Sequence, residues 1–254
     1  MSKLPQKMAL DESILQKSVQ VFRGEVKPCR GVIVVSRRQR RILVSFRGSS
    51  FHSLSTFVAD SKIFLSQWPA FWPESKVHQG FKGVHLKCYG SYSARVLEYA
   101  HQYPRAKVIF VGHSLGGALS LLGALQFGHD HPHIRHRLEV TTFGMPRIGN
   151  DHFSRGYNQF GITTNRITNG FDLVSNLPFF YGYTHVRGEI YIVPESHETI
   201  YCTYNEETLE EDNACSNRIT FSTSRLQDHG AYWGIGDYLP YRLSRPSTDT
   251  LVGS

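Results

Sequence analysis

Short apolar runs separated by polar stretches make up much of this 254-residue chain. Two of them, 32–35 and 42–46, flank a polar stretch at 36–40, and this arrangement predicts a β-hairpin over residues 31–47. A third run at 107–111 does not alternate with polar residues, so we expect a strand that is buried on both faces. Further strand-like segments lie at 138–143, 163–167 and 189–193.

Helical spacing separates these strands. Over residues 80–103 apolar side chains recur every four positions, which predicts one helical face and a helix that ends before Pro104. Residues 118–125 form a second expected helix, rich in small side chains, and Asn150 fits the N-cap of a third that ends at Phe160. Strands that alternate with helices predict an α/β fold with a mostly parallel sheet. No linker rich in Pro, Gly or Ser divides the chain, so we expect one domain.

Composition restricts the function classes further. No apolar run approaches the ~18 to 20 residues needed to span a bilayer, and residues 1–15 lack the apolar core of a secretory signal. The 28 basic and 21 acidic residues give a net charge of +7, which favours anionic partners. Four arginines concentrate this charge at the tip of the hairpin: Arg37, Arg38, Arg40 and Arg41. We interpret the cluster as a solvated turn, with an anionic surface as the alternative; the lack of interleaved aromatic residues argues against nucleic acid.

The segment from Gly112 to Gly116 has the form Gly-x-Ser-x-Gly and lies between the strand predicted at 107–111 and the following helix. In that context the motif describes a tight turn that presents a serine above the edge of a sheet. The glycines remove side chains that would collide there. We therefore predict that Ser114 is a nucleophile and that the Leu115 N–H faces the oxyanion of a tetrahedral intermediate.

A nucleophilic serine needs a base, and the base needs a carboxylate that fixes its tautomer. In sheet hydrolases the acid follows the serine, and the histidine follows the acid. Asp172 lies just past the strand predicted at 163–167, at the carboxyl end where the sites of open α/β sheets are found. Asp151 is the competitor, although its place after Asn150 also fits an ordinary capping role.

The histidine is harder to choose, because the chain contains 13 of them. His229 lies well beyond Asp172, in a segment of mixed aromatic and polar residues. His185 and His197 are its rivals, and the neighbours of His185 are typical of a packed histidine. His113 adjoins the serine on the wrong side of the turn for a base.

Six segments in this order resemble the class 3 lipases, the family of the filamentous-fungal triacylglycerol lipases. The resemblance extends from about residue 31 to residue 236. The segments are VSFRGSS at 44–50, VHQGF at 77–81, VGHSLGGA at 111–118, FGMPRIGN at 143–150, RITNGFDLV at 166–174 and DHGAYWG at 228–234. Six motifs in order are far more specific than one, and they imply an α/β-hydrolase fold with helices that flank the sheet.

The resemblance implies the same triad of Ser114, Asp172 and His229, and it implies no metal and no organic cofactor. It also implies an oxyanion hole formed by the N–H groups of Ser49 and Leu115, with the Ser49 hydroxyl as a further candidate donor. Each such donor is worth on the order of 2.7 to 4 kcal/mol of transition-state stabilisation.

A short helical lid between residues 50 and 60 is a further feature that the resemblance implies. Its apolar face would cover the acyl site in water and turn outward against lipid. The residues expected on that face are Phe51, Leu54, Phe57 and Val58. A surface helix packed on the core is the alternative.

Four cysteines are too few for a disulfide scaffold, and the resemblance matches Cys202 and Cys215 to a disulfide of the family. Cys29 has no match, and a buried free thiol is expected at Cys88. The His-rich stretch at 129–136 has the density of a zinc site without its spacing, so we interpret it as a polar loop.

The front of the chain departs from the family. Class 3 lipases carry more residues ahead of the Arg-Gly-Ser loop, and residues 1–30 match none of them. We expect one lipase domain over residues 31–254, with a front that is either rebuilt or incomplete.

The expected function is that of a serine carboxylic-ester hydrolase acting on lipid esters at a lipid–water interface, most specifically a secreted triacylglycerol lipase. Within the same chemistry, the alternative is an esterase of short-chain, partial-glyceride or aromatic (feruloyl-type) esters. Outside it, the alternative is a lipase-like protein inactivated by a truncated front. The positive net charge would favour adsorption to anionic lipid.

Overall fold

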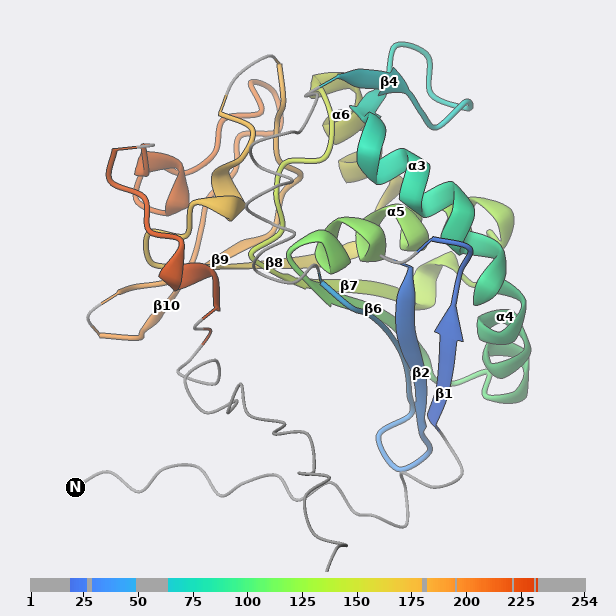
Figure 1. The fold of residues 1–254 in the computed structure, drawn as a ribbon. Helices are drawn as coiled ribbons and strands as arrows, with labels where there is room; N and C mark the ends of the chain where they lie inside the picture. Colours follow the sequence, from blue (N-terminus) through green and yellow to red (C-terminus); the bar gives the residue numbers. More distant parts are fainter. Residues whose placement is uncertain are drawn as a thin grey trace, which may run out of the picture.

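The computed structural model describes residues 19–26, 29–48, 64–179, 182–194, 196–220, 222–230 and 232. Within them, eight strands form one sheet in the order β1-β2-β3-β6-β7-β8-β9-β10 (Figure 1). These strands are β1 (Val19–Arg23), β2 (Arg30–Ser36), β3 (Arg41–Phe46), β6 (Lys107–His113), β7 (Leu138–Phe143), β8 (Thr163–Asn169), β9 (Glu189–Ile192) and β10 (Thr199–Tyr201). A separate ribbon pairs β4 (Leu65–Gln67) with β5 (Lys76–His78).

The centre of the sheet is parallel and its margins are antiparallel. Strands β3, β6, β7, β8 and β9 pair in parallel, while β1 and β2 on one side and β10 on the other pair antiparallel. The predicted hairpin is confirmed, with Val35 opposite Ile42 and Gly31 opposite Phe46. The expected α/β fold with a mostly parallel central sheet is confirmed.

Burial along the strands follows their place in the sheet. In β3 the buried residues alternate with half-buried ones, as in a strand near the margin. In β6 three consecutive residues, 108–110, are buried, as is typical of a strand in the middle of a sheet. The run without alternation at 107–111 therefore does mark a central strand.

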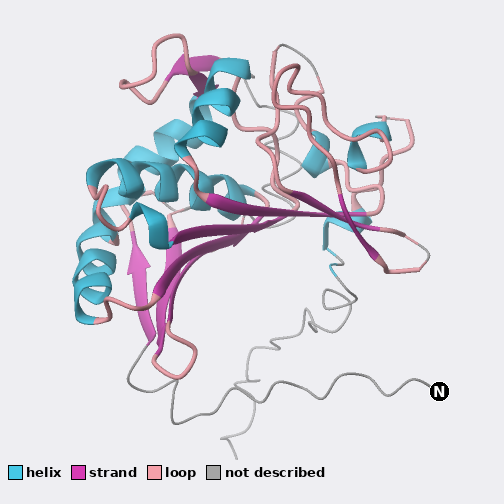
Figure 2. Ribbon diagram, turned by 180° about the vertical axis from the view of Figure 1, so that it is seen from behind, coloured by secondary structure: helices cyan, strands magenta, loops and turns pink. Residues whose placement is uncertain are grey.

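Four α-helices lie on one face of this sheet: α3 (Gln79–Cys88), α4 (Ser93–Gln102), α5 (Leu115–Asp130) and α6 (Asp151–Phe160) (Figure 2). Helix α5 is buried along almost its whole length, which its small side chains permit. A Cβ added at Gly123 would lie 2.5 Å from the hydroxyl of Tyr92. The small residues thus let α5 approach the sheet and its neighbouring helix closely.

Helix α6 has the ends predicted for it. The Asn150 side chain accepts a hydrogen bond of 3.1 Å from the Phe153 N–H, which satisfies a donor that the first turn leaves unpaired. At the other end Gly161 adopts a φ of 81°, the left-handed conformation that glycine tolerates and that ends many helices.

The prediction of a single helix over residues 80–103 is wrong. Two helices, α3 and α4, occupy this segment, and a 3₁₀ turn at Tyr89–Ser91 separates them. Gly90 weakens the helix at that point, and the break lets the Tyr92 ring pack on Phe22 and Phe46, with ring centroids 5.2 and 5.1 Å away. Burial of Tyr92 therefore outweighs helical continuity.

The front of the described chain belongs to the sheet. Strand β1, which lies ahead of residue 31, pairs with β2. The free thiol expected at Cys88 is also wrong, because a disulfide joins Cys88 to Cys29. The sequence offered no local signal for this pair, since 59 residues separate the two cysteines.

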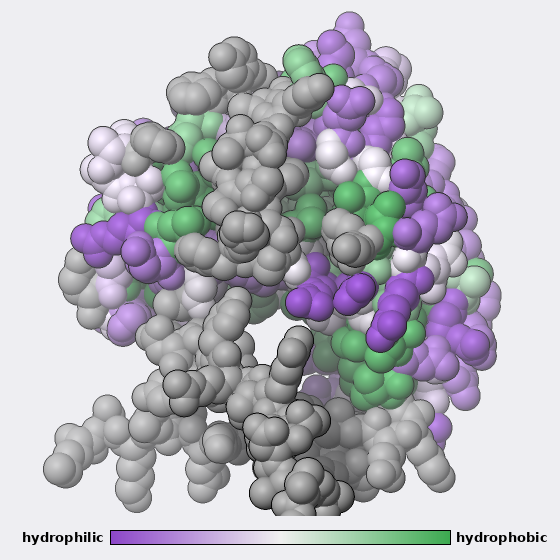
Figure 3. Space-filling view, in the orientation of Figure 1, coloured by the Kyte–Doolittle hydropathy of each residue, from purple (hydrophilic) through white to green (hydrophobic). Residues whose placement is uncertain are grey.

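The outer strands are less completely covered than the centre. In the space-filling view an apolar patch lies at the lower right, over the position of β1 and β2 in Figure 1 (Figure 3). The side chain of Val21 in β1 is 66% exposed. None of the helices in the described ranges combines the length and the apolar character that a membrane crossing requires.

Removal of the Cys29–Cys88 disulfide should lower the free energy of unfolding by about 2 to 4 kcal/mol, because it restores chain entropy to the unfolded state. The variant carries Cys29→Ala and Cys88→Ala, and its matched control carries Cys202→Ala and Cys215→Ala, a disulfide that closes a separation of 13 residues. The free energy of unfolding of the control should fall by about 1 kcal/mol less than that of the variant. Urea unfolding measures both, and a larger loss in the control would contradict the entropic explanation.

Candidate active site

Ser114 lies at the turn between β6 and α5 in a conformation that serine rarely adopts. Its φ is 57° and its ψ is −127°, and a non-glycine residue there costs on the order of 1 to 3 kcal/mol. The Ser114 N–H donates a hydrogen bond of 2.8 Å to the Phe143 carbonyl at the end of β7. The turn is thereby fixed to the neighbouring strand, as in the serine turn of α/β-hydrolases.

The two glycines of the motif are required by close contacts. A Cβ at Gly112 would lie 2.2 Å from the backbone of Gly116, and one at Gly116 would lie 2.5 Å from the Phe46 carbonyl oxygen. The first turn of α5 can therefore lie against the end of β3. Its leading N–H groups have no acceptors within the helix and carry the positive end of the helix dipole.

Asp172 and His229 form a buried pair. Asp172 follows β8 and is completely buried, and His229 lies in the 3₁₀ turn Gln227–Gly230 with 2% of its surface exposed. The His229 Nδ1 lies 2.9 Å from Asp172 Oδ2 and 3.1 Å from Oδ1. The carboxylate holds the proton on Nδ1, so Nε2 carries the lone pair that a general base needs.

Two further donors complete the surroundings of the Asp172 carboxylate. The Val174 N–H donates to Oδ1 at 2.8 Å, and the Tyr232 hydroxyl donates to Oδ2 at 2.7 Å. Burial and the charge of Asp172 raise the pKa of Tyr232 well above its ordinary value, so Tyr232 remains a donor. A buried carboxylate needs such partners, because its desolvation is otherwise very unfavourable.

The segment that carries His229 is tied to the turn that carries Asp172. The Asp228 side chain accepts a hydrogen bond of 2.8 Å from the Phe171 N–H, and its carbonyl accepts one of 3.0 Å from Asn169 Nδ2. These contacts join residues that are 57 and 59 positions apart. They fix the distance between the base and its acid.

His113 lies against His229 and is not a competing base. Its Nε2–H donates to the His229 carbonyl at 2.6 Å, and the two rings lie 4.4 Å apart. Burial, together with the charge of His229, lowers the pKa of His113 to about 4. His113 is therefore neutral at neutral pH and serves as a donor to the backbone of the base.

Two reactive atoms remain without hydrogen bonds. Ser114 Oγ and His229 Nε2 are both buried, and neither has a partner within the described residues. Catalytic hydrogen bonds often tighten only when substrate is bound. Both atoms therefore retain hydrogen-bonding capacity for a ligand.

The rival residues lie elsewhere. Asp151 is exposed in the first turn of α6 and accepts a hydrogen bond from Thr184. His185 is buried, and its Nε2 donates to the Ser175 carbonyl at 2.7 Å. His197 is exposed after β9, where its backbone N–H bonds the Val193 carbonyl.

Part of the expected site lies outside the described residues. This applies to Ser49 and to the expected lid residues Phe51, Leu54, Phe57 and Val58. The described range 29–48 ends at Gly48, where a Cβ would come within 2.8 Å of the His113 carbonyl oxygen. The backbone that leads to Ser49 therefore runs beside the Ser114 turn.

A disulfide joins Cys202 and Cys215 in the loop beyond β10. The His-rich stretch begins in α5 and not in a loop, since His129 lies inside the helix and stacks on Phe71 with ring centroids 3.6 Å apart. Across the described segments, no three His, Cys, Asp or Glu side chains are grouped as a metal site would require.

Sequence reasoning gave no individual role to three residues beside the triad. Tyr232 and Asp228 stand in the quoted C-terminal motif, and their proximity to His229 in the chain was the available signal. Gly144 has a φ of 57°, and a Cβ there would lie 2.6 Å from Tyr232 Oη, 2.7 Å from Asp172 Oδ2 and 2.7 Å from His229 Nδ1. Only glycine fits at this position without displacing the acid–base pair.

Comparison with known proteins agrees with this geometry. The family described as Lipase (class 3) matches residues 43–182. The lipase of Rhizomucor miehei is 36% identical over 78% of this chain and 53% of its own length. The secreted mono- and diacylglycerol lipase 3 of Gibberella zeae is 31% identical over 47% of this chain and 38% of its own length. The chain thus spans about half the length of the Rhizomucor relative.

A solved structure is similar over most of the chain. It is that of a triacylglycerol lipase whose catalytic centre is formed by a serine protease triad, and it superposes with a TM-score of 0.76. The two chains are 31% identical over 86% of this chain and 82% of that one.

Gly144→Ala should slow the reaction of Ser114 with an alkyl fluorophosphonate by about a hundredfold, the effect expected when reacting groups are displaced by about 1 Å. The control is Gly161→Ala, at a φ of 81°, where the nearest atom to a new Cβ is 3.9 Å away. Both variants carry the left-handed strain of about 1 to 2 kcal/mol, but only the first collides with the acid–base pair. Equal labelling rates in both would show that Gly144 does not support the site.

Proposed function

Because the chain belongs to the class 3 lipase family, we propose that it is a serine carboxylic-ester hydrolase of lipid esters, most specifically a triacylglycerol lipase. The observation that carries this proposal is the buried pair of His229 and Asp172, 2.9 Å apart, at the same end of the sheet as the strained Ser114 turn. A serine, a histidine and a carboxylate in this chain order are typical of acyl transfer on an α/β sheet.

The reaction proceeds in two halves. Ser114 Oγ attacks the acyl carbonyl of the ester while its proton passes to His229 Nε2. The tetrahedral intermediate collapses, the bond to the alcohol breaks, and His229 returns the proton to the departing alcohol oxygen. Water then attacks the acyl-enzyme with His229 again as base, which releases the fatty acid and restores the Ser114 hydroxyl.

Asp172 orients His229 throughout this cycle. It retains its negative charge beside the transient imidazolium and holds the ring so that Nε2 faces the serine. Tyr232 and the Val174 N–H fix the carboxylate with hydrogen bonds of 2.7 and 2.8 Å. The carboxylate therefore does not rotate when the charge on His229 changes.

The oxyanion would be stabilised by the Leu115 N–H at the start of α5 and by Ser49, through its N–H and its hydroxyl. Support for the first donor comes from its place in the leading turn of a 16-residue helix. Support for the second comes from the approach of Gly48 to the His113 carbonyl. No metal or cofactor takes part in this chemistry.

The substrate is a lipid ester at a lipid–water interface, and the expected lid residues Phe51, Leu54, Phe57 and Val58 lie outside the described residues. Secretion is part of this proposal, because the relatives include a secreted lipase. The alternative is an esterase for partial glycerides or for short-chain or aromatic esters. The similarity to a mono- and diacylglycerol lipase favours the partial-glyceride form of that alternative.

Ser114→Ala should reduce ester hydrolysis by about a millionfold, the loss seen when a triad serine is removed. The variant should also fail to react with a fluorophosphonate that labels the parent protein. Ser120→Ala is the control, because Ser120 lies further along α5 and its hydroxyl donates to the Gly116 carbonyl. Hydrolysis by Ser114→Ala within tenfold of the parent would overturn the proposal.

The substrate class is tested by comparing a soluble short-chain ester with emulsified tri- and diacylglycerols. The lidded lipase should show a steep rise in rate once substrate exceeds its solubility, since the apolar lid face is then buried in lipid. A partial-glyceride preference would appear as faster hydrolysis of diacylglycerol than of triacylglycerol. No rise at the interface would assign the chain to the esterases.

A further inference from the structure

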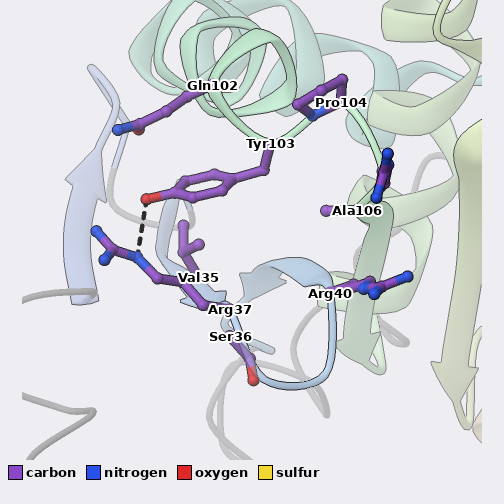
Figure 4. Close-up of a pocket in the computed structure, with 9 residues that line it drawn as sticks. Val35, Ser36, Arg37, Arg40, Gln102, Tyr103, Pro104 and Ala106 are labelled. Carbon is purple, nitrogen blue, oxygen red and sulfur yellow. Dashed lines mark hydrogen bonds between the residues drawn. The ribbon is translucent and has the colours of Figure 1, made fainter.

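A cavity lies at the opposite end of the sheet from Ser114. It has a volume of about 440 Å³ and lies between the β2–β3 turn and residues 102–106, which follow α4 (Figure 4). Val35, Tyr103, Pro104 and Ala106 line it with apolar surface. Its size is within the range of small-molecule sites.

The walls of this cavity are held by backbone contacts. The Arg40 carbonyl accepts a hydrogen bond of 2.9 Å from the Lys107 N–H, which fixes the β2–β3 turn to the start of β6. The guanidinium of Arg137 donates to the Ala100, Tyr103 and Ala106 carbonyls at 3.1, 2.8 and 2.8 Å. A ligand would therefore meet a site that is already formed, which limits the entropy lost on binding.

Three arginines give the cavity its charge. Arg37, Arg40 and Arg105 line it, and no acidic residue does. The Arg37 Nε donates to the Tyr103 hydroxyl at 3.1 Å, so its terminal amino groups remain available. None of the three forms an ion pair within the described residues, unlike Arg95, which pairs with Glu98.

We propose that this cavity binds a free fatty acid, with its carboxylate on the arginines and its acyl chain along the apolar wall. Guanidinium groups bind carboxylates through paired, charge-assisted hydrogen bonds. The wall of Val35, Tyr103 and Pro104 would remove the first methylenes of the chain from water. The choice of ligand rests on the proposed function, because ester hydrolysis releases a fatty acid.

The position of the cavity favours a single amphiphile over a membrane surface. Ala106 precedes the seven residues of β6 and Ser114 follows them, so the two sites are roughly 26 Å apart at about 3.3 Å per residue. A bilayer that docked on the arginines would hold the Ser114 end of the sheet away from lipid. A monomeric fatty acid has no such conflict.

The test is calorimetric titration of the full chain with dodecanoate below its micelle concentration. Dodecanoate has no ester bond, so the titration measures binding apart from hydrolysis. Arg37→Gln combined with Arg40→Gln should weaken binding at this site by about tenfold or more, since charge-assisted hydrogen bonds are lost. Arg38→Gln is the matched control, because it removes one charge from the same turn but does not line the cavity; it should change affinity by less than about twofold.

Further ligands separate the chemistry of the site. Dodecanoate should bind more tightly than acetate, inorganic phosphate or uncharged dodecanol. Equal binding of acetate or phosphate would overturn the role of the apolar wall, and equal binding of dodecanol would overturn the role of the arginines. An equal loss of affinity in the Arg38→Gln control would show that binding depends on general surface charge and not on this cavity. If phosphatidylglycerol vesicles bound through the arginines and dodecanoate did not bind, the ligand of this site would be a membrane surface and not a fatty acid.

The two proposals can fail separately. If Ser114→Ala retained hydrolysis, the proposed function would fail while arginine-dependent binding of dodecanoate could still be measured. If dodecanoate did not bind, hydrolysis by the parent protein would remain. Thermal unfolding of the arginine variants checks that their fold is unchanged, as expected for exposed side chains.

Discussion

The backbone turn at Ser114 is the constraint on which the rest of the structure depends. A φ of 57° at a serine is unfavourable. It persists because the packed surroundings of the turn permit no other backbone conformation. Gly112 and Gly116 carry no side chains, so the first turn of α5 lies against the end of β3 with contacts that any Cβ would break. The small residues of α5 continue this close approach along the helix. Packing of the central layer thus maintains the strained turn that positions the Ser114 hydroxyl.

Asp172 and His229 reach this turn from distant parts of the chain, and a parallel sheet explains how the first of them does so. Strands β6, β7 and β8 run in the same direction, so Ser114 and Asp172 follow strands that end at one edge. His229 has no strand of its own and depends on contacts: Asp228 bonds the turn before Asp172, and the His113 ring donates to the His229 carbonyl. The base is therefore positioned by hydrogen bonds between loops, whereas the nucleophile is positioned by the sheet.

Local features of the chain could be predicted from sequence, and contacts between distant residues could not. The strand at 138–143 and the helix that Asn150 caps follow from apolar spacing and from one side-chain hydrogen bond, which are properties of neighbouring residues. The break near Gly90 and the pairing of Cys29 with Cys88 depend on what the fold brings against them. Chain order and motif context were enough to propose Asp172 and His229. The requirement for glycine at position 144 arises only when three segments meet, so no pattern of residues predicts it.

The two ends of β6 bear different chemistry, and the distance between them keeps that chemistry separate. Arg37, Arg40 and Arg105 are exposed at one end, where water and salt reduce their field over a Debye length of about 8 Å at physiological ionic strength. Ser114, Asp172 and His229 lie several such lengths away and are buried, and the Asp172 carboxylate accepts hydrogen bonds from Tyr232 and the Val174 N–H. The arginines therefore contribute little to the electrostatics of the triad. None of the three forms an ion pair with the described residues, and an anion with an apolar tail fits both their charge and the wall beside them.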